Sequence, residues 1–266
     1  MMKKNSLLVF ALALAALFCV AAVSQAQSPF NGTWKTDISQ TKWSPKPLIF
    51  YISQGWYHCV TCNPTFDVAA DGQDHAVAGQ SYDTMAVMIS DDHTISVTTK
   101  KDGKVVYEQS RTVSKDGKTL TVHTVDHPKD SDKPMEFDSK AKRDGTLRPG
   151  VHATSGRWII EQQKGSDDAY LTTYSVNGDQ ITMTSPDGET YTATFGGGDA
   201  PAKGAYGYNT VSLRRINPHS IEETDKRDGR VTDVTVMTIS PDGKKMTAVD
   251  NDKVNGRTET FVAKKQ

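Results

Sequence analysis

Cysteine is scarce in this chain: there are three in 266 residues, and one of them, Cys19, lies in an apolar N-terminal run. Catalytic signatures are missing as well, since there is no Gly-x-Ser-x-Gly elbow, no phosphate-binding glycine loop and no His-Glu-x-x-His sequence. The formal net charge is −1, so no basic excess would attract nucleic acid or anionic lipid. His123 and His127 lie four positions apart, which is roughly 13 Å along a strand and too far to share a metal ion. We therefore expect no enzyme, nucleic-acid partner, cofactor or metal.

The N-terminal segment predicts export from the cytoplasm. Two lysines precede an apolar run at 7–23, and Ser24 and Ala26 place small residues at the minus-three and minus-one positions of a cleavage site. We predict a signal peptide over 1–26 and a secreted protein that is periplasmic or extracellular; a retained membrane anchor is the alternative. After the predicted cleavage site no apolar stretch is long enough to span a bilayer as a helix.

The chain contains the same segment twice. Residues 82–118 align without a gap onto 208–244, at a constant offset of 126. Most of the identical positions are turn formers and strand residues, so the repeat specifies a shape rather than a reaction. The interpretation is a first repeat at 27–142, a linker at 143–155 and a second repeat at 156–266.

Both repeats predict antiparallel β-structure. Val, Thr and Tyr alternate with polar residues over short segments, which suits half-buried strands, and no sustained 3.6-residue periodicity indicates a helix. Pairs such as Asp102-Gly103 and Asp228-Gly229 separate these segments and favour two-residue hairpin turns. The predicted fold is all-β with little helix, as two tandem antiparallel meander barrels. The predicted strands are 33–36, 48–53, 65–69, 84–89, 94–100, 105–113, 119–125 and 135–139, then 157–163, 169–176, 180–184, 189–195, 210–216, 220–226, 231–239, 245–249 and 258–263.

Two longer segments without a predicted strand, 72–81 and 196–207, directly precede Tyr82 and Tyr208. They are either irregular surface loops or lids over the mouths of the barrels. Because the two tyrosines follow these segments in both repeats, we include them among the candidate ligand-binding residues.

Each repeat opens with Gly-x-Trp, at 32–34 and at 156–158. Gly-x-Trp on the first strand of an antiparallel meander resembles the signature of the lipocalin, or calycin, family. The resemblance implies an eight-stranded up-and-down barrel in which Trp34 and Trp158 are structural residues packed across the closed ends, with their indole N–H groups bonded. It also implies a small, apolar ligand. In that family a late Arg stacks on the Trp, and the sequence does not identify this residue.

Cys59 and Cys62 are the cysteines that remain after signal cleavage, and such a pair forms a disulfide in an oxidising compartment. A redox-active pair and a zinc site with His58 are the alternatives, but the βαβ context and a second cysteine pair are missing. Trp56 and Tyr57 precede the pair, and the second repeat has no such cluster. Aromatic rings beside a stapled loop can stack on a flat ligand, so both are candidate ligand-binding residues; an apolar patch capping the first barrel is the alternative.

Together these features predict an exported, non-catalytic protein that binds a small, apolar molecule. One alternative is a structural or protein-interaction module of the cell envelope, whose barrels would be filled with side chains. Another is a hydrolase of polysaccharides, whose sign would be a cleft lined by Trp56, Tyr57 and acidic residues. An enclosed cavity would distinguish a carrier from a filled module.

Overall fold

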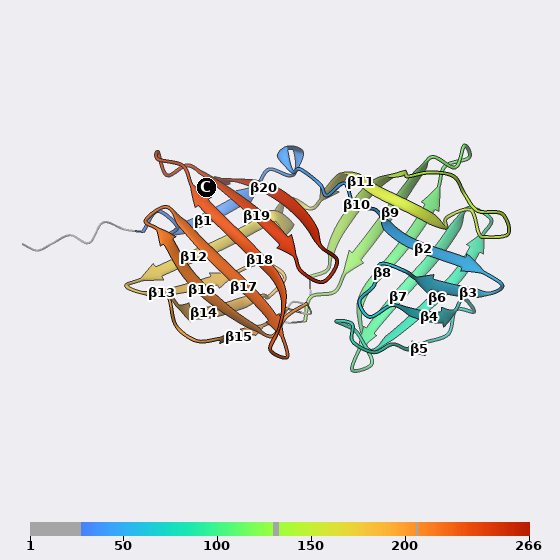
Figure 1. Cartoon of the computed structure of the whole chain (residues 1–266), viewed down its shortest axis with the longest axis horizontal. Helices are drawn as coiled ribbons and strands as arrows, with labels where there is room; N and C mark the ends of the chain where they lie inside the picture. The colour runs from blue at the N-terminus through green and yellow to red at the C-terminus, as the bar shows by residue number, and fades with distance from the viewer. Residues whose placement is uncertain (1–27, 130–132, 206) are drawn as a thin grey trace, which may run out of the picture.

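The computed structural model describes residues 28–129, 133–205 and 207–266, so the predicted signal peptide lies outside the described residues. Two antiparallel sheets of ten strands each curl into barrels that lie side by side along the long axis of the molecule (Figure 1). Helix is limited, in this part of the chain, to two short 3-10 turns, η1 (Ile38–Gln40) and η2 (Asp167–Tyr170). The described residues include no helix with the length and apolar character to cross a membrane. The predicted all-β fold of two antiparallel barrels is confirmed.

The first barrel is the sheet formed by β2 to β11, in the order β4-β3-β2-β11-β10-β9-β8-β7-β6-β5. Its two edges approach where Asp71, just after β4, forms an isolated bridge with Met88 on β6, so the sheet is nearly closed. Its strands are β2 (Leu48–Ser53), β3 (Trp56–Cys59), β4 (Phe66–Ala69), β5 (His75–Ala76), β6 (Thr84–Asp91), β7 (Thr94–Lys101), β8 (Lys104–Val113), β9 (Thr119–Asp126), β10 (Met135–Arg143) and β11 (Gly156–Gly165).

The second barrel is a closed sheet, because its first strand, β1, pairs with both β12 and β20. The remaining strands follow one another in sequence order, as the meander prediction requires. The strands are β1 (Gly32–Thr36), β12 (Leu171–Asn177), β13 (Gln180–Thr184), β14 (Thr190–Thr194), β15 (Ala200–Lys203), β16 (Thr210–Asn217), β17 (Ser220–Arg227), β18 (Arg230–Ile239), β19 (Lys245–Asp252) and β20 (Arg257–Lys265).

The two Gly-x-Trp strands are exchanged between the barrels. β1 belongs to the first repeat but completes the second barrel, whereas β11 opens the second repeat but pairs with β10 and β2 in the first barrel. Figure 1 shows blue β1 among the orange and red strands, and yellow-green β11 among the green and blue ones. The chain crosses between barrels after each of these strands, at η1 and η2. The segment 143–155, predicted to link the two repeats, does not connect the two barrels. It runs from the end of β10 to β11, and both strands belong to the first barrel.

Trp34 and Trp158 occupy the same position in their barrels, and each is 1% exposed. The indole Nε1 of each Trp donates a hydrogen bond to the carbonyl oxygen four residues earlier, that of Phe30 or Thr154, at 2.9 Å in both cases. Burying these large rings with their one donor satisfied contributes several kcal/mol of apolar stabilisation to each barrel, at roughly 25 cal/mol per Å².

A cation covers each of these rings. Arg143 places Cζ 4.1 Å from the ring of Trp158, and Lys265 places Nζ 5.2 Å from that of Trp34. The glycine two residues before each Trp makes room for the cation: Gly32 has φ +120°, and a Cβ there would lie 2.8 Å from Cε of Lys265. The glycine of Gly-x-Trp is therefore needed for two reasons: its backbone has a positive φ, and a side chain there would collide with the cation that stacks on the Trp ring.

The aligned segments fold alike. β6 to β9 correspond to β16 to β19 at the offset of 126, and their registers shift at the same places, including Ile89/Asp91 and Arg215/Asn217. Asp102 and Asp228 have φ values of 50° and 52° and are each followed by a positive-φ glycine, as the hairpin turns require. Equivalent positions can therefore be compared residue by residue.

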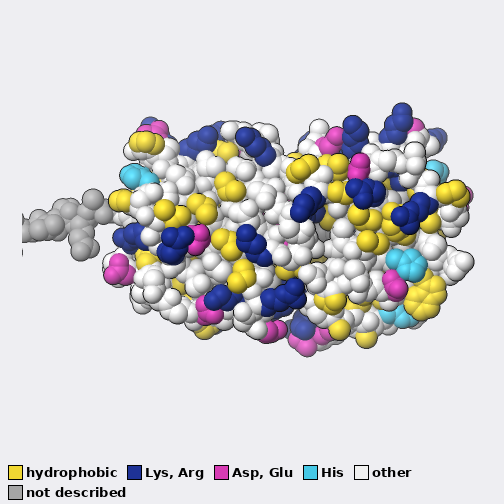
Figure 2. Space-filling view, in the orientation of Figure 1, with side chains coloured by type: hydrophobic (Ala, Val, Ile, Leu, Met, Phe, Trp, Pro, Cys, Tyr) yellow, Lys and Arg dark blue, Asp and Glu magenta, His cyan; other side chains and the backbone are white. Residues whose placement is uncertain are grey.

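Three short strands fall outside the predicted set: β3, β5 and β15. β3 lies in the segment interpreted as an aromatic cluster, and β5 and β15 lie in the two segments predicted to be surface loops or lids. On the face shown in Figure 2, Lys and Arg side chains are scattered over both barrels with acidic side chains between them. This face therefore presents a mixed-charge surface.

Candidate functional site

The interior of the first barrel contains a cavity of about 290 Å³. Its walls are mainly apolar and aromatic, with a few polar groups, which is the composition of small-molecule sites. The volume is just below the usual range of about 300–1,000 Å³, which suits a small ligand. The apolar walls include Phe50, Tyr57, Met85, Leu120, Val122, Ala141, Trp158 and Ile160, and the polar groups include Thr61, Gln109, Arg111, Thr124 and Ser139.

Arg111 on β8 brings a guanidinium group into this cavity. Gln109 and Arg111 are two positions apart, so both point to the interior face of the strand. The guanidinium donates from Nη1 to the hydroxyl of Tyr57 at 3.1 Å, and from Nε and Nη2 to Oε1 of Gln109 at 2.9 and 2.6 Å. No carboxylate of the described residues forms an ion pair with it. Three of its five N–H groups are used, which leaves two for another acceptor.

Aromatic rings surround this guanidinium. Its Cζ lies 5.0 Å from the ring centroid of Phe50 and 5.9 Å from that of Tyr57, and these two rings stack at 5.5 Å. Tyr82 and Tyr107 meet edge to face at 5.7 Å nearby. Burial raises the pKa of both of these phenols, so their hydroxyls stay protonated and can donate hydrogen bonds.

The cavity opens toward a groove of about 600 Å³ between the two barrels. Four residues line both spaces: Thr61, Cys62, Tyr82 and Tyr107. The barrels are joined beside this groove by a hydrogen bond from Arg227 Nη1 to the carbonyl oxygen of Gly79 at 3.0 Å. The cavity and the groove therefore adjoin at these four residues.

The cysteine pair lies at this opening. The sulfur atoms of Cys59 and Cys62 are at bonding distance and their Cα atoms are 5.4 Å apart, so the predicted disulfide is confirmed. Cys59 is 7% exposed and belongs to the core of the barrel, while Cys62 lines both the cavity and the groove. The disulfide therefore connects the wall of the cavity to its rim.

The structure brings together two of the four candidate ligand-binding residues. Tyr57 and Tyr82 both line the cavity. Trp56 is on the opposite face of β3 and 49% exposed, because neighbouring side chains of a strand alternate. Tyr208 lies in the second barrel beside Glu189. The ligand-binding role of all four stays a prediction.

Sequence reasoning missed Arg111 and Gln109. A charged or polar residue on a strand is ordinarily assigned to the solvent side, so the alternating pattern did not place either side chain in the interior. The signal that could have identified Arg111 was the repeat itself, because the equivalent position holds Met237, a buried apolar residue. A charged residue in one repeat at a position that is apolar and buried in the other indicates that the two barrel interiors differ in chemistry there.

The interior of the second barrel is acidic. Glu223 and Asp225, two positions apart on β17, are each 8% exposed. The hydroxyl of Tyr191 donates to Glu223, whereas Oδ1 of Asp225 is buried without a hydrogen-bond partner among the described residues. Burial raises the pKa of both carboxyls, and repulsion by Glu223 raises that of Asp225 further. Burial also raises the pKa of Glu189 to about 7.

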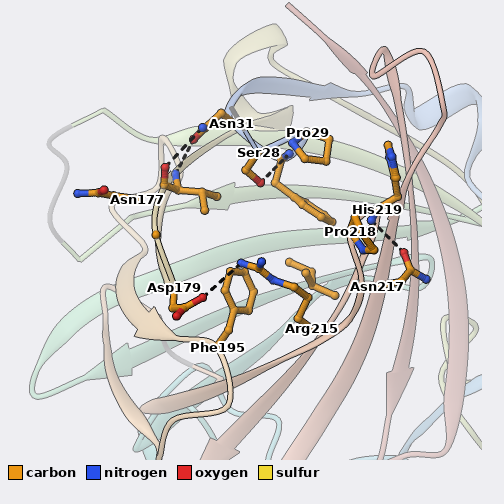
Figure 3. A pocket seen from close by; sticks show the side chains of 14 residues that line it. Ser28, Pro29, Asn31, Asn177, Asp179, Phe195, Arg215, Asn217, Pro218 and His219 are labelled. Carbon is orange, nitrogen blue, oxygen red and sulfur yellow. Dashed lines mark hydrogen bonds and ion pairs between the residues drawn. The ribbon is translucent and has the colours of Figure 1, made fainter. Parts of the chain in front are cut away.

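A larger open groove of about 970 Å³ lies at one end of the second barrel (Figure 3). Arg215 stacks its guanidinium 4.4 Å from the ring of Phe195 and lies 3.9 Å from Asp179 across the groove. At the corresponding place in the first barrel, His152 donates a hydrogen bond from Nε2 to the carbonyl oxygen of Asp91 at 2.7 Å. The charge of the open groove is already paired, so we assign no site to it.

Metal ligation finds no support in the described part of the chain, where no three His, Cys, Asp or Glu side chains could hold one ion. His123 contacts Asp138 at 3.0 Å, and His127 contacts Glu108 at 3.1 Å. These are separate surface pairs between neighbouring strands.

The chain matches no protein-family model, no curated protein and no solved structure. The functional argument therefore depends on the geometry of the two interiors.

Proposed function

We propose that this chain is an exported, non-catalytic protein that binds a small amphipathic anion, a carboxylate on an apolar body, inside the first barrel. The observation that carries the proposal is the guanidinium of Arg111, which lines the cavity without a carboxylate partner. Apart from Tyr57 and Gln109, which it already contacts, the wall around it is mainly apolar and aromatic, so a ligand with both an apolar body and an anionic end fits this interior.

Electrostatics favours the anion. A partly buried cation without a counterion loses hydration that its aromatic neighbours replace only in part. A ligand carboxylate would accept hydrogen bonds from the free N–H groups of Arg111 and from the hydroxyl of Tyr57, and such charge-assisted bonds are each worth about 1.5–3 kcal/mol. The rest of the affinity would come from burying the apolar body against Phe50, Met85 and Leu120.

The two alternative functions have weaker support. A filled interaction module would have no interior space, whereas the first barrel holds about 290 Å³. A polysaccharide hydrolase would need Trp56, Tyr57 and acidic residues on one cleft, but the first two residues lie on opposite faces of β3. Export is part of the proposal because of the predicted signal peptide, and the mass of the mature protein would test cleavage after residue 26.

The lipocalin resemblance supports the same function. Arg143 over Trp158 corresponds to the late cation that stacks on the Trp in that family, although it reaches a Trp from the other repeat. The barrels differ from the eight-stranded pattern in having ten strands each. We therefore use the resemblance as support for a ligand-binding barrel.

Calorimetric titration with octanoate, 1-octanol and octylammonium tests the proposal, because the three probes share an apolar chain and differ in charge. We expect octanoate to bind about 10- to 100-fold more tightly than 1-octanol, from the value of a charge-assisted bond. Arg111→Met should remove that preference and leave 1-octanol unchanged. Arg148→Met is the matched control, since Arg148 is exposed and stacks on Tyr51 outside the cavity. Equal affinity of the wild type for octanoate and 1-octanol would contradict the proposal.

A further inference from the structure

The interiors of the two barrels carry opposite charges, and each charge occupies a position where the other barrel has an apolar residue. Arg111 of the first barrel corresponds to Met237, whereas Glu223 of the second barrel corresponds to Val97. All four side chains face the interior of their barrels. Two copies of one fold have therefore diverged at the positions that a ligand inside would contact.

The second barrel has an interior cavity of its own, of about 170 Å³. Three aromatic rings, those of Trp34, Tyr174 and Phe261, form part of its wall, and Glu223 supplies a carboxylate. The apolar remainder includes Met237, Met246, Ala248 and Ala263. Aromatic faces beside a carboxylate form an environment that favours a cation. Among the described residues, the wall of this cavity includes no Lys, Arg or His side chain that could pair with an anion.

Asp225 is a second buried carboxyl on β17, outside the set of residues that line the cavity. The side chain is 8% exposed and lies on the same face of β17 as Glu223, since the buried positions of this strand alternate. Its Oδ1 has no hydrogen-bond partner among the described residues. An acceptor buried in this way costs roughly 1–3 kcal/mol. The interior of this barrel is therefore acidic beyond the wall of the cavity itself.

We propose that the interior of the second barrel is a separate site for a small organic cation, a primary ammonium on an aromatic or apolar body. The ammonium would donate to Glu223, while the body would pack among Trp34, Tyr174 and Phe261. An inorganic cation is disfavoured, because no three His, Cys, Asp or Glu side chains in the described chain are arranged to ligate one ion. The site uses none of the residues proposed to bind the anion, so it stands independently of that function.

Methyl-¹³C-methionine NMR of the full mature protein tests this site, because methionines report on each interior. Met237 and Met246 line the second cavity, and Met85 lines the first. Benzylammonium, titrated at pH 7.5, should shift the Met237 and Met246 signals and leave Met85 in place. Benzyl alcohol, which is neutral and nearly isosteric, should bind at least tenfold more weakly.

Variants assign the effect to the interior carboxylate. Glu223→Gln keeps a partner for Tyr191 and should reduce benzylammonium affinity at least tenfold, to that of benzyl alcohol. Glu222→Gln is the matched control, because Glu222 is the next residue of β17, points outward and pairs with Arg214 at 2.9 Å. Arg111→Met should leave benzylammonium binding unchanged, so failure here is distinguishable from failure of the anion site.

Two results would overturn the inference. One is that benzylammonium and benzyl alcohol shift Met237 and Met246 of the wild type equally at equal concentration, which needs no variant and so does not depend on Glu223→Gln folding. The other is that Glu223→Gln and Glu222→Gln bind benzylammonium as tightly as the wild type.

Discussion

Arg111 and Met237 occupy the same position on equivalent strands, β8 and β18, at the constant offset that relates the two repeats. Both side chains line an interior cavity, one with a guanidinium and the other with a thioether. Since the backbone around them is the same down to its bulges, the difference lies in chemistry and not in shape. This pair therefore locates where the duplicated barrels have diverged.

Removing the interior cation should stabilise the empty protein. Arg111→Met replaces a charge that no carboxylate neutralises with the apolar residue that the second barrel uses at this place. We expect the free energy of unfolding in urea to rise by about 1 kcal/mol without ligand, because the desolvated charge is gone. Arg148→Met, at the surface, should stay within about 0.5 kcal/mol of the wild type. A loss of 2 kcal/mol or more would instead make Arg111 a structural anchor for Tyr57 and Gln109.

Stability should fall as pH rises from about 5 to 9. Burial raises the pKa of Glu189 to about 7 and of Asp233 to about 6, and it raises those of Glu223 and Asp225 as well. The folded state therefore binds more protons than the unfolded state. This contribution is complete below the ordinary carboxyl pKa of about 4 and is lost as pH rises through the raised values. Urea denaturation across this range should show a decrease of roughly 2–4 kcal/mol.

The double variant Glu223→Gln/Asp225→Asn isolates the buried pair. It should flatten the pH profile and be more stable than the wild type at pH 9, since neither amide can ionise. Glu222→Gln should keep the wild-type profile. A wild-type stability that is constant or increases between pH 5 and 9 would show that the interior carboxyls are not protonated in the folded protein.

Reduction of Cys59–Cys62 should have a modest effect on stability and a larger one on ligand binding. The bond closes a loop with a sequence separation of 3, and loop-closure entropy for so small a loop is worth roughly 2 kcal/mol. Because Cys62 lines both cavity and groove, octanoate should dissociate faster from the reduced protein. Denaturation and stopped-flow release, with and without dithiothreitol, measure both effects. The Cys59→Ser/Cys62→Ser variant should resemble the reduced protein and show no response to dithiothreitol.

The strand exchange could not be predicted from local sequence. Alternation and turn chemistry identify most strands, because they depend on neighbours two to four residues away. The choice between partners for these strands depends on distant neighbours: β1 pairs with β12 and β20, and β11 pairs with β2, all more than 100 residues away in the chain. Both strands also carry the same Gly-x-Trp. Either strand fits either barrel by pattern alone. The short crossovers at η1 and η2, which carry the chain into the other sheet, have no distinctive sequence.

The sequence predicted the aromatic residues of the candidate site but not its charged ones. Tyr57 and Tyr82 are aromatic and attracted attention, and they do line the cavity. Arg111 and Glu223 are charged, and period-two alternation cannot identify the buried face of a strand when polar residues occupy it. Their interior placement follows from the closure of the barrels, a tertiary property.

Because β1 and β11 are exchanged between the barrels, we expect that the second repeat does not fold on its own. A chain of residues 156–266 alone contains β11 without its partners and lacks β1, so the second barrel has a gap between β12 and β20. We expect this chain to lack a cooperative urea transition and to give poorly dispersed amide NMR signals. The loss includes the buried ring of Trp34, and truncating such a ring typically costs 3–5 kcal/mol.

A rearranged chain provides the control. Lys35 pairs with Leu171, so the end of β1 lies beside the start of β12, and a short Gly-Asn turn can join residues 28–36 directly to 171–266. This chain has all ten strands of the second barrel in spatial order. We expect it to unfold cooperatively and to retain benzylammonium binding, because its cavity residues are complete. If 156–266 folded as well as the rearranged chain, β1 would not be needed to close the barrel, and the exchange would have no energetic importance.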